Sequence, residues 1–382
     1  MMKPGYKQTE IGVIPEDWEA KPLKDVAPLQ RGFDLPYSQM EEGKYPVVFS
    51  NGVGAFHNAY MAKGPGVITG RSGTIGKVHY ISTNYWPHNT TLWVTDFHGN
   101  DEKYVYYLFQ TVPWELFNSG SSVPTLNRND IHDTLHAIPP RPEQRRIAEA
   151  LSDMDELIAS LEKLIAKKKA IKQGAMQELL TGKRRLPGFS GEWNAVELRK
   201  LGRFVGGGTP STNNLDWWKG KTPWISSSDL EENQIRTIKM SRYITEEAIS
   251  HSATNLCPAG AILVVSRVGV GKVAVAPVDL CTSQDFTNII VNNCNPCFLA
   301  YTLSIVMKEK AATTQGTSIK GVTSDEIAAI KVRIPSRLEQ DAIANALESI
   351  DQDIGSIEKQ YLKAYQIKQG MMQQLLTGRI RV

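Results

Sequence analysis

Apolar residues recur at alternating steps of four and three positions in two stretches of this chain. These positions are Ile147, Leu151, Met154, Ile158, Leu161 and Ile165 in the first stretch, and Ile343, Leu347, Ile350, Ile354, Ile357 and Tyr361 in the second. This heptad pattern predicts two long helices, each with one apolar face. The first should run from near Pro142 to Leu180, about 58 Å at 1.5 Å per residue. Because the two patterns share one phase, helices that pack on each other are favoured over helices that each lie on their own domain.

The stretches between the two helical patterns indicate globular domains. Short Val- and Ile-rich runs alternate there with Gly and Pro, which predicts mainly sheet with a few helices, one of them through "DEKYVYYLFQ". The fold class is therefore expected to be α+β, with two mixed globular domains and two long helices. The expected boundaries are residues 1–140 and 187–336 for the globular domains, and 141–186 and 337–382 for the helical segments.

The chain also repeats itself. "IKQGAMQELLTG" at residues 171–182 returns as "IKQGMMQQLLTG" at 367–378, and the offset of 196 persists upstream to "GSSVPTLNRNDI" from Gly120 and "GTSIKGVTSDEI" from Gly316. Two equal units that pack around a two-fold axis must place their helices in opposite directions. We therefore expect an antiparallel coiled coil with pseudo-two-fold symmetry.

A glycine stands at the same place in both helical patterns. Gly174 and Gly370 each cost about 1 kcal/mol relative to alanine inside a helix. Close approach of a backbone, from the other helix or from a partner, would explain this cost. A local kink is the alternative.

Composition narrows the class of protein. The 382 residues carry 43 basic and 40 acidic side chains, a net charge of +3, so no strong overall field draws the chain to nucleic acid. The sequence has neither an apolar run of membrane-spanning length nor the apolar core of a signal peptide, so we expect a cytoplasmic protein without membrane contact.

The four cysteines bear on a possible metal site. Cys294 and Cys297 in "CNPC" suggest zinc, but no second closely spaced pair accompanies them. In the alternative, Asn295 caps a helix and Pro296 opens it. We therefore expect buried free thiols and no metal.

A glycine-containing hairpin with basic residues occurs in each globular segment. "RSGTIGKV" and "RVGVGKV" do not match the phosphate-binding P-loop, because position 71 is arginine rather than glycine, and a valine, Val78 or Val273, follows the lysine. Glycines allow close backbone approach, while Arg and Lys can meet phosphates or guanine edges. The candidate DNA-binding residues of these hairpins are Arg71, Ser72, Thr74, Lys77, Arg267 and Lys272. A glycine turn with solvated charges is the alternative.

Hydroxyl- and amide-rich segments are further candidates for DNA contact. An ordinary loop that caps the following helix at Asp130 or Asp325 is the alternative. Trp217 and Trp218 could line a groove or be packed. The candidates are Ser121, Ser122, Thr125, Asn127, Arg128, Lys219, Lys221, Ser226, Ser227, Thr317, Ser318, Lys320 and Thr323.

The sequence offers little for catalysis. It contains no H-E-x-x-H, no G-x-S-x-G, no Asn/Asp-Pro-Pro-aromatic box and no glycine-rich cofactor fingerprint. This favours a DNA-reading protein without a catalytic centre of its own.

The duplicated "IPPRPEQRRIAEALSDMD" and "IPSRLEQDAIANALESID", followed by "QELLTG" and "QQLLTG", resemble the specificity subunit of type I restriction-modification enzymes over nearly the whole chain. This resemblance implies two target-recognition domains that read a bipartite, asymmetric double-stranded DNA sequence, with the helices as a ruler for the spacer. It also implies two methyltransferase subunits docked on the helices, which bring S-adenosylmethionine and adenine-N6 chemistry, and restriction or translocase subunits as further partners.

Two other functions stay open. The chain could be the recognition portion of a fused methyltransferase-nuclease, against which the absent cofactor and catalytic boxes argue. It could also be a coiled-coil scaffold without a DNA function.

Overall fold

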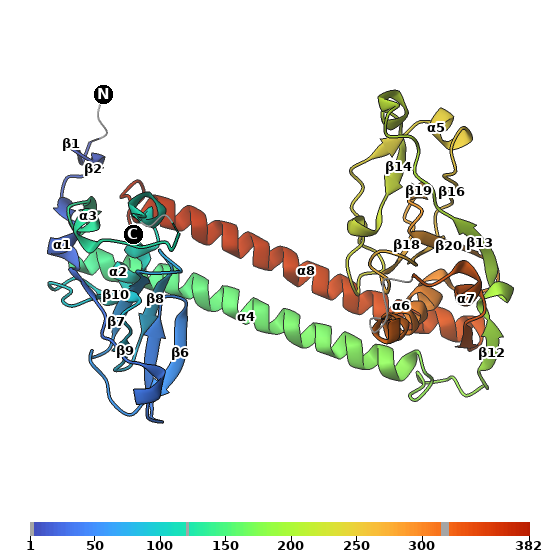
Figure 1. The fold of residues 1–382 in the computed structure, drawn as a ribbon, viewed down its shortest axis with the longest axis horizontal. Helices are drawn as coiled ribbons and strands as arrows, with labels where there is room; N and C mark the ends of the chain where they lie inside the picture. The colour runs from blue at the N-terminus through green and yellow to red at the C-terminus, as the bar shows by residue number, and fades with distance from the viewer. Residues whose placement is uncertain (1–3, 120–121, 315–320) are drawn as a thin grey trace. The chain divides into compact units, whose positions relative to one another are not determined.

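The computed structural model describes residues 4–119, 122–314 and 321–382. The chain folds as two compact units, one formed by Met1–Glu162 with Lys359–Val382 and the other by Lys163–Glu358. The two long helices, α4 (Arg141–Leu179) and α8 (Arg337–Leu375), are each divided between the units (Figure 1). Each unit therefore contains the first half of one helix and the second half of the other.

The first unit is built on a four-stranded sheet of order β4-β10-β7-β8 and a three-stranded sheet of order β6-β5-β9. Its helix α2 is the one expected through "DEKYVYYLFQ", capped by the Asp101 side chain. The strands are β1 (Tyr6–Thr9), β2 (Gly12–Pro15), β3 (Glu19–Pro22), β4 (Leu29–Arg31), β5 (Tyr45–Phe49), β6 (Gly52–His57), β7 (Gly66–Gly70), β8 (Val78–Ile81), β9 (Trp86–Pro87), β10 (Thr91–Val94) and β11 (Leu135–Ile138), and the short helices are α1 (Leu23–Val26), α2 (Glu102–Phe109) and α3 (Arg128–His132).

The second unit repeats this plan with sheets of order β13-β20-β17-β18 and β15-β14-β19-β16. Its helix α6 begins at Pro296, and the Asn295 side chain accepts a hydrogen bond from the Phe298 backbone amide at 2.9 Å, so the expected cap is confirmed. The strands are β12 (Asn194–Glu197), β13 (Gly202–Gly206), β14 (Thr222–Ile225), β15 (Tyr243–Ile244), β16 (Leu256–Cys257), β17 (Ile262–Val265), β18 (Val273–Val275), β19 (Leu280–Thr282), β20 (Phe286–Val291) and β21 (Lys331–Ile334), and the short helices are α5 (Glu246–Ser250), α6 (Pro296–Thr314) and α7 (Ser324–Ala328).

The central strands are buried along their whole length because both of their faces are covered. Every residue of β7 and of β17 is buried. Successive side chains of a strand point to opposite faces. Ile262 accordingly packs in one core cluster and Leu263 in another, and Val67 and Ile68 are divided in the same way. The two faces of the central sheet therefore line separate core clusters in each unit.

The predicted apolar seam of the helices faces inward. None of its twelve residues is exposed. In the first unit, Ile147 and Leu151 of α4 lie in the same core cluster as Met372 and Leu375 of α8. In the second unit, Ile343 and Leu347 of α8 share a cluster with Leu179 of α4. The start of each helix thus packs both on its own domain and on the end of the other helix, so the two packing modes that the sequence suggested occur together.

Within each unit the two helical segments run antiparallel. In the first unit, Tyr361 bonds to Glu162 and Lys368 pairs with Asp155, so residue numbers rise along one helix as they fall along the other. In the second unit the same relation holds for Lys168 with Asp353 and for Lys172 with Asp351. The expected direction of the coiled coil is therefore confirmed inside each unit.

An arginine at the end of each repeat forms an ion pair with a buried glutamate at the start of the other long helix. Arg381 donates to both carboxylate oxygens of Glu143 at 2.6 and 2.7 Å, and to Asp17. Arg185, 196 positions earlier, makes the equivalent fork to Glu339, 196 positions after Glu143. The side chains of Glu143 and Glu339 are only 3% and 2% exposed, so each carboxylate depends on its arginine. The pairing raises the pKa of Arg381 further above its usual range.

The turn before each arginine contains a glycine that a larger residue could not replace. Gly182 and Gly378 have φ of +72° and +70°, a conformation that glycine adopts without strain. A Cβ on Gly182 would touch the Trp193 ring, and one on Gly378 would collide with Pro15. The glycines of "LLTG" therefore let the chain reverse tightly against the tryptophan that opens each globular domain.

A second set of contacts is also duplicated. Lys172 pairs with Asp351 at 2.5 Å, and its ammonium lies 5.5 Å from the Tyr301 ring, whose hydroxyl donates to Asp351 at 2.6 Å. Lys368, Asp155 and Tyr107 form the same arrangement in the first unit, with distances of 2.6, 5.6 and 2.7 Å. Burial raises the pKa of both tyrosines, so they remain hydrogen-bond donors. These triads join the two helices and the domain in each unit.

The expected approach of the two helices at the repeated glycines is wrong. A Cβ built on Gly174 or on Gly370 would meet nothing within 4 Å. Both glycines lie on the exposed face of their helices, because the inward face is already filled by the larger residues of the seam. An approach by a partner and a local kink are the expectations that stay open.

The arginine forks predict a specific loss of stability. Among the residues that the structure describes, Arg381→Ala would leave the buried Glu143 carboxylate with the Trp18 indole N–H as its one remaining side-chain donor. We expect the midpoint of thermal unfolding of the first unit to fall by about 5 °C. Hydrogen exchange read out by mass spectrometry would assign the loss to residues 1–162 and 359–382. Lys24→Ala, which removes an exposed ion pair with Asp133 in the same unit, is the control and should change little.

Three half-buried histidines should make the first unit sensitive to mild acid. Burial lowers the pKa of His136 to about 4 and lowers those of His79 and His132. Unfolded histidine titrates near a pKa of about 6.5, so the unfolded state binds the extra protons and stability falls as the pH drops from about 6.5 towards 4. Urea unfolding at pH 7 and pH 5 should show this fall, and His136→Gln should reduce it. Equal losses of stability in the wild type and in His136→Gln would contradict the assignment of the pH dependence to His136. The same substitution at the exposed His251 is the control.

Candidate nucleic-acid interface

Among the described strands, each unit pairs two in parallel, and the loops that follow them lie side by side. β5 pairs with β9 in the first unit, and β14 with β19 in the second. The His88 amide donates to the Val48 carbonyl and the Ser283 amide to the Ile225 carbonyl, both at 2.9 Å. Because parallel strands end at the same edge, this edge is where a fold of this kind can present loops to a ligand.

The predicted hairpin of the first domain joins these loops. The backbone amides of Arg71 and Ser72 donate to the Thr90 carbonyl at 2.8 and 3.1 Å. The Lys77 ammonium donates to the Asn51 carbonyl at 3.0 Å. The hairpin therefore contacts the loop that follows β5 and the loop that follows β9.

The hydroxyl-rich segments lie against the same hairpins. The Leu126 amide donates to the Arg71 carbonyl at 2.9 Å, and Ser72 forms a β-bridge with Thr125. In the second domain, the Val322 amide donates to the Ser266 carbonyl at 2.7 Å. Two groups of candidates that are separate in the sequence thus form one surface in each domain. We call residues 50–51, 71–77, 88–90 and 122–127 the first loop cluster, and residues 226–230, 266–272, 283–285 and 321–323 the second loop cluster.

The hairpin lysines hold the clusters together as well as carrying charge. Lys272 donates to the carbonyls of Ser227 and Leu230 at 3.1 and 2.8 Å, so it fixes the turn after β14. Arg267, in contrast, is exposed at the tip of its hairpin. Lys77 is exposed as well, while Arg71 is half-buried and reaches the Asn89 carbonyl.

Two candidate residues are helix caps. The Asn127 side chain accepts from the Asn129 amide and begins α3, and the Thr323 side chain forms a reciprocal capping box with Glu326 at the start of α7. The alternative function of these segments, helix capping, is therefore real, but its expected positions at Asp130 and Asp325 are wrong. A cap must precede the first turn, and both aspartates lie within it.

The serines after β14 stabilise their own turn. Ser226 caps that turn and also accepts a hydrogen bond from Arg242, which pairs with Asp229 and stacks on Trp224. The Ser227 backbone carbonyl is the one held by Lys272.

Lys219 and Lys221 lie away from the second loop cluster. They precede β14 and so stand at its amino end, whereas the cluster follows its carboxyl end. Lys219 is paired with Asp216 at 2.8 Å in an exposed position. Trp217 and Trp218 pack against a core cluster around Trp224, as the alternative to groove-lining proposed.

The remaining candidates can be placed briefly. Thr74, Ser122 and Arg128 are exposed on or beside the first loop cluster. Ser121, Thr317, Ser318 and Lys320 lie outside the described residues.

Sequence reasoning missed the loops that follow the second parallel strand. These loops hold His88, Asn89 and Thr90 in the first domain, and Ser283, Gln284 and Asp285 in the second. β9 has only two residues, so no periodic pattern marks it. The polar runs "HNT" and "SQD" after short apolar strands were the available signal.

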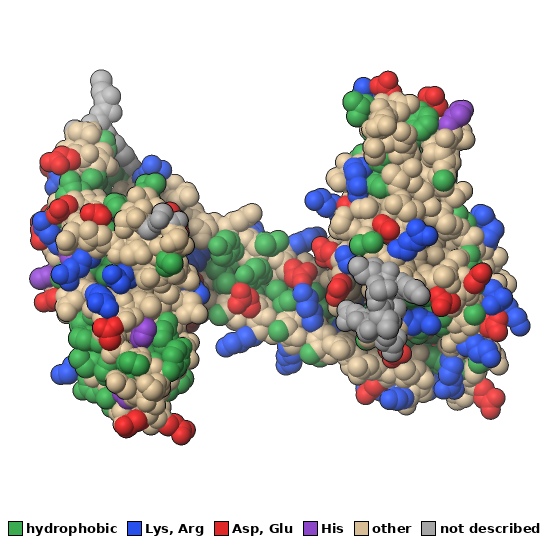
Figure 2. All heavy atoms as spheres, in the orientation of Figure 1, with side chains coloured by type: hydrophobic (Ala, Val, Ile, Leu, Met, Phe, Trp, Pro, Cys, Tyr) green, Lys and Arg blue, Asp and Glu red, His purple; other side chains and the backbone are tan. Residues whose placement is uncertain are grey.

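Other surfaces of the molecule are less suited to a polyanion. Figure 2 shows hydrophobic side chains gathered over the β5–β6 part of the first unit. Tyr37, Val53, Phe56 and Met61 are exposed there, at 45% or more. This patch can contact apolar partners but offers few donors to phosphates.

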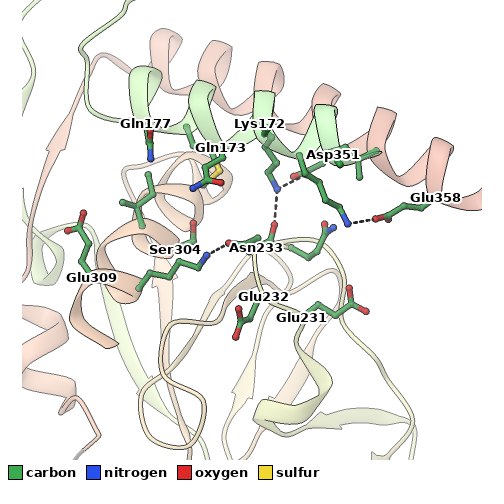
Figure 3. Close-up of a pocket in the computed structure, with 18 residues that line it drawn as sticks. Lys172, Gln173, Gln177, Glu231, Glu232, Asn233, Ser304, Glu309, Asp351 and Glu358 are labelled. Atoms are coloured by element: carbon green, nitrogen blue, oxygen red, sulfur yellow. Dashed lines mark hydrogen bonds and ion pairs between the residues drawn. The ribbon is translucent and has the colours of Figure 1, made fainter. Parts of the chain in front are cut away.

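A cavity of about 600 Å³ lies between α4, α6, α8 and the loop 231–234 of the second unit. Figure 3 shows Lys172 engaged with Asp351 and with the Asn233 carbonyl. Lys169 pairs with Glu358 at 2.7 Å. Lys308 bonds to the Asn233 side chain. These contacts fix the loop to the helices, and we assign the cavity no chemistry.

The cysteines are buried free thiols, as expected. Burial raises the pKa of Cys257, Cys294 and Cys297 to about 12 and that of Cys281 to about 11, so the thiols stay protonated at neutral pH. Across residues 4–119, 122–314 and 321–382, His, Cys, Asp and Glu side chains form no group of three or more that could hold a metal ion. Within the same described ranges, no helix combines the length and apolarity needed to cross a membrane.

Comparison with known proteins agrees with this architecture. A model of the family described as type I restriction modification DNA specificity domain matches residues 15–173 and 190–364. The type I restriction enzyme MjaIX specificity subunit of Methanocaldococcus jannaschii is 32% identical over 176 residues, which are 44% of this chain and 40% of that protein. The putative MjaX specificity subunit of the same organism is 26% identical and covers 99% of this chain and 97% of its own. The S subunit of a type I restriction-modification system from M. genitalium has a TM-score of 0.67 at 16% identity, with 98% and 99% of the chains covered.

A duplicated frame that carries two unlike loop clusters defines a DNA-recognition protein of two-domain design. The family match covers both repeats, including both loop clusters. The chain therefore belongs to the family of type I restriction-modification DNA specificity subunits.

The hairpin tips predict how DNA affinity depends on salt. Arg267→Ala removes an exposed cation that makes no ion pair with another described residue, so the protein should stay folded and bind every duplex more weakly. The slope of log affinity against log salt should become shallower by about one. Fluorescence anisotropy over a potassium chloride series measures this slope. Lys331→Ala, an exposed lysine on β21, is the control, and an unchanged slope for Arg267→Ala would remove this residue from the interface.

Proposed function

We propose that this chain is the specificity subunit that directs a methyltransferase to a bipartite, asymmetric DNA sequence. The observation that carries the proposal is that the helix contacts are repeated in both units, whereas the side chains of the loop clusters are not. The helix contacts recur at an offset of 196 residues, whereas the loop clusters present different side chains on the same backbone plan. One frame with two different reading surfaces suits a target whose two half-sites differ.

The chemistry belongs to partner subunits in this proposal. Two lysines of the described cavity, Lys169 and Lys172, are paired with Glu358 and Asp351, and the sequence has no cofactor fingerprint. We therefore assign S-adenosylmethionine and methyl transfer to adenine N6 to methyltransferase subunits, and DNA recognition to this non-catalytic chain. The assembly would act in the cytoplasm.

The repeated phrase "IKQG" offers two equal docking faces. Ile171 and Ile367 are 48% and 45% exposed, although they lie on helices whose inward faces are apolar. Three positions further along, on the same side of the helix, Gly174 and Gly370 have open space around them. An exposed isoleucine beside a bare stretch of backbone lets a partner element approach closely. Two such faces with one sequence fit two copies of one partner, here the methyltransferase subunit.

Methyl transfer and stoichiometry test this proposal together. The purified chain alone should transfer no methyl group from S-adenosylmethionine, and should support transfer at one bipartite sequence once the methyltransferase is added. Native mass spectrometry should show two methyltransferase copies on the wild-type chain. Ile171→Glu or Ile367→Glu should leave one copy, and the double variant none, because a buried charge opposes docking.

Leu338→Glu is the matched control, since Leu338 is 76% exposed on α8 outside the repeated phrase. Turnover by the lone chain would disprove the non-catalytic assignment. Two copies retained by the double variant would place docking elsewhere.

A further inference from the structure

The loop after the second parallel strand carries a primary amide at its middle position in both domains. In the first domain this is Asn89, and in the second it is Gln284. Asn89 is half-buried and Gln284 is exposed. An Asn or Gln amide can pair with the adenine edge in the major groove, because its carbonyl accepts from N6 and its N–H donates to N7.

Each amide is held at one end by its own domain. The Asn89 amide nitrogen donates to the Asp34 carboxylate, and the Gln284 amide oxygen accepts from the Thr209 hydroxyl. Asp34 is in turn paired with Arg31 at 3.1 Å, so its charge is compensated. The contact leaves one N–H of Asn89 and its oxygen for a ligand. It leaves both N–H groups and one lone pair of Gln284.

The same backbone feature places both holding residues. Strands β4 and β13 are each followed by a tightly packed glycine, Gly32 and Gly207. A Cβ on Gly32 would collide with the carbonyl of His88, and one on Gly207 with that of Ser283. Two residues after each glycine stands the side chain that holds the amide. Two domains with different side chains have therefore kept one arrangement, in which a glycine brings the preceding strand against the loop and an amide is oriented from that strand.

We infer that Asn89 and Gln284 are specificity-determining residues, each reading an adenine edge in the half-site bound by its own domain. Asp34 and Thr209 are the positioning residues that set the plane of each amide. Side-chain rotation is restricted before DNA arrives, which lowers the entropy lost on binding. This inference rests on the proposed function, because it requires each loop cluster to face one half-site.

The test uses the complete chain with its methyltransferase and a panel of duplexes in which every base pair of the bipartite target is changed in turn. Asn89→Ala should weaken binding of the cognate duplex about tenfold and remove discrimination at one adenine of one half-site. Gln284→Ala should do the same in the other half-site. In each case the opposite half-site should be read as in the wild type.

An isosteric variant keeps the test decisive if an alanine variant loses its fold. Gln284→Glu retains the shape and the Thr209 contact but presents only acceptors, so preference at that position should move from adenine towards cytosine, whose N4 is a donor. Asn58→Ala and Asn293→Ala, exposed amides outside the loop clusters, should change neither affinity nor discrimination.

The outcomes separate this inference from the proposed function. Equal weakening on every duplex, or an unchanged pattern of discrimination, would overturn the assignment of Asn89 and Gln284 while leaving the bipartite reader intact. A wild-type complex without sequence preference in either half would instead overturn the proposed function.

Discussion

The rest of the structure depends on the two-pronged ion pair between an arginine at the end of one repeat and a buried glutamate at the start of the other repeat's long helix. Glu143 and Glu339 open the two long helices, and each is almost fully removed from water. A carboxylate in that position is stable only when a cation reaches it. The cation comes from the end of the other repeat, Arg381 or Arg185, so neither repeat completes its own core. This constraint makes the two halves of the chain interdependent, although their reading surfaces are independent.

The contacts of the repeated frame must stay constant, whereas the side chains of the loop clusters can vary. The forks, the Lys-Asp-Tyr triads and the glycine turns at Gly182 and Gly378 recur in both units because each satisfies a buried charge or a steric limit. The loop clusters are held largely by backbone hydrogen bonds, such as those of Arg71 and Ser266. A backbone contact does not depend on the side chain that it carries. Side chains in these loops can therefore change the DNA sequence that is read without loss of the frame.

The sequence predicted the parts of the fold that have a period or a repeat. The heptad pattern located both ends of α4 to within about one residue, and the repeat placed a matching helix, α8, in the segment 337–382. The offset of 196 predicted their antiparallel pairing, which is found inside each unit. The candidate site was predicted in part. The hairpins and hydroxyl-rich segments do come together, but β9 is too short to carry a pattern, so Asn89 was missed. Lys272 looked like a free cation because the carbonyls that it binds, at Ser227 and Leu230, are more than forty residues away in the sequence.

The two amides show how such a site can diverge without losing its geometry. Asp34 and Thr209 differ in charge and in the direction of their hydrogen bond, since one accepts from an amide nitrogen and the other donates to an amide oxygen. Yet each fixes the amide plane, because an amide has a donor and an acceptor end and either can be held. The glycine that brings the strand close is the shared requirement, as no side chain fits between Gly32 and His88 or between Gly207 and Ser283. Steric limits on the backbone thus preserve the position of the amide. The residue that holds the amide can be either a hydrogen-bond acceptor or a hydrogen-bond donor.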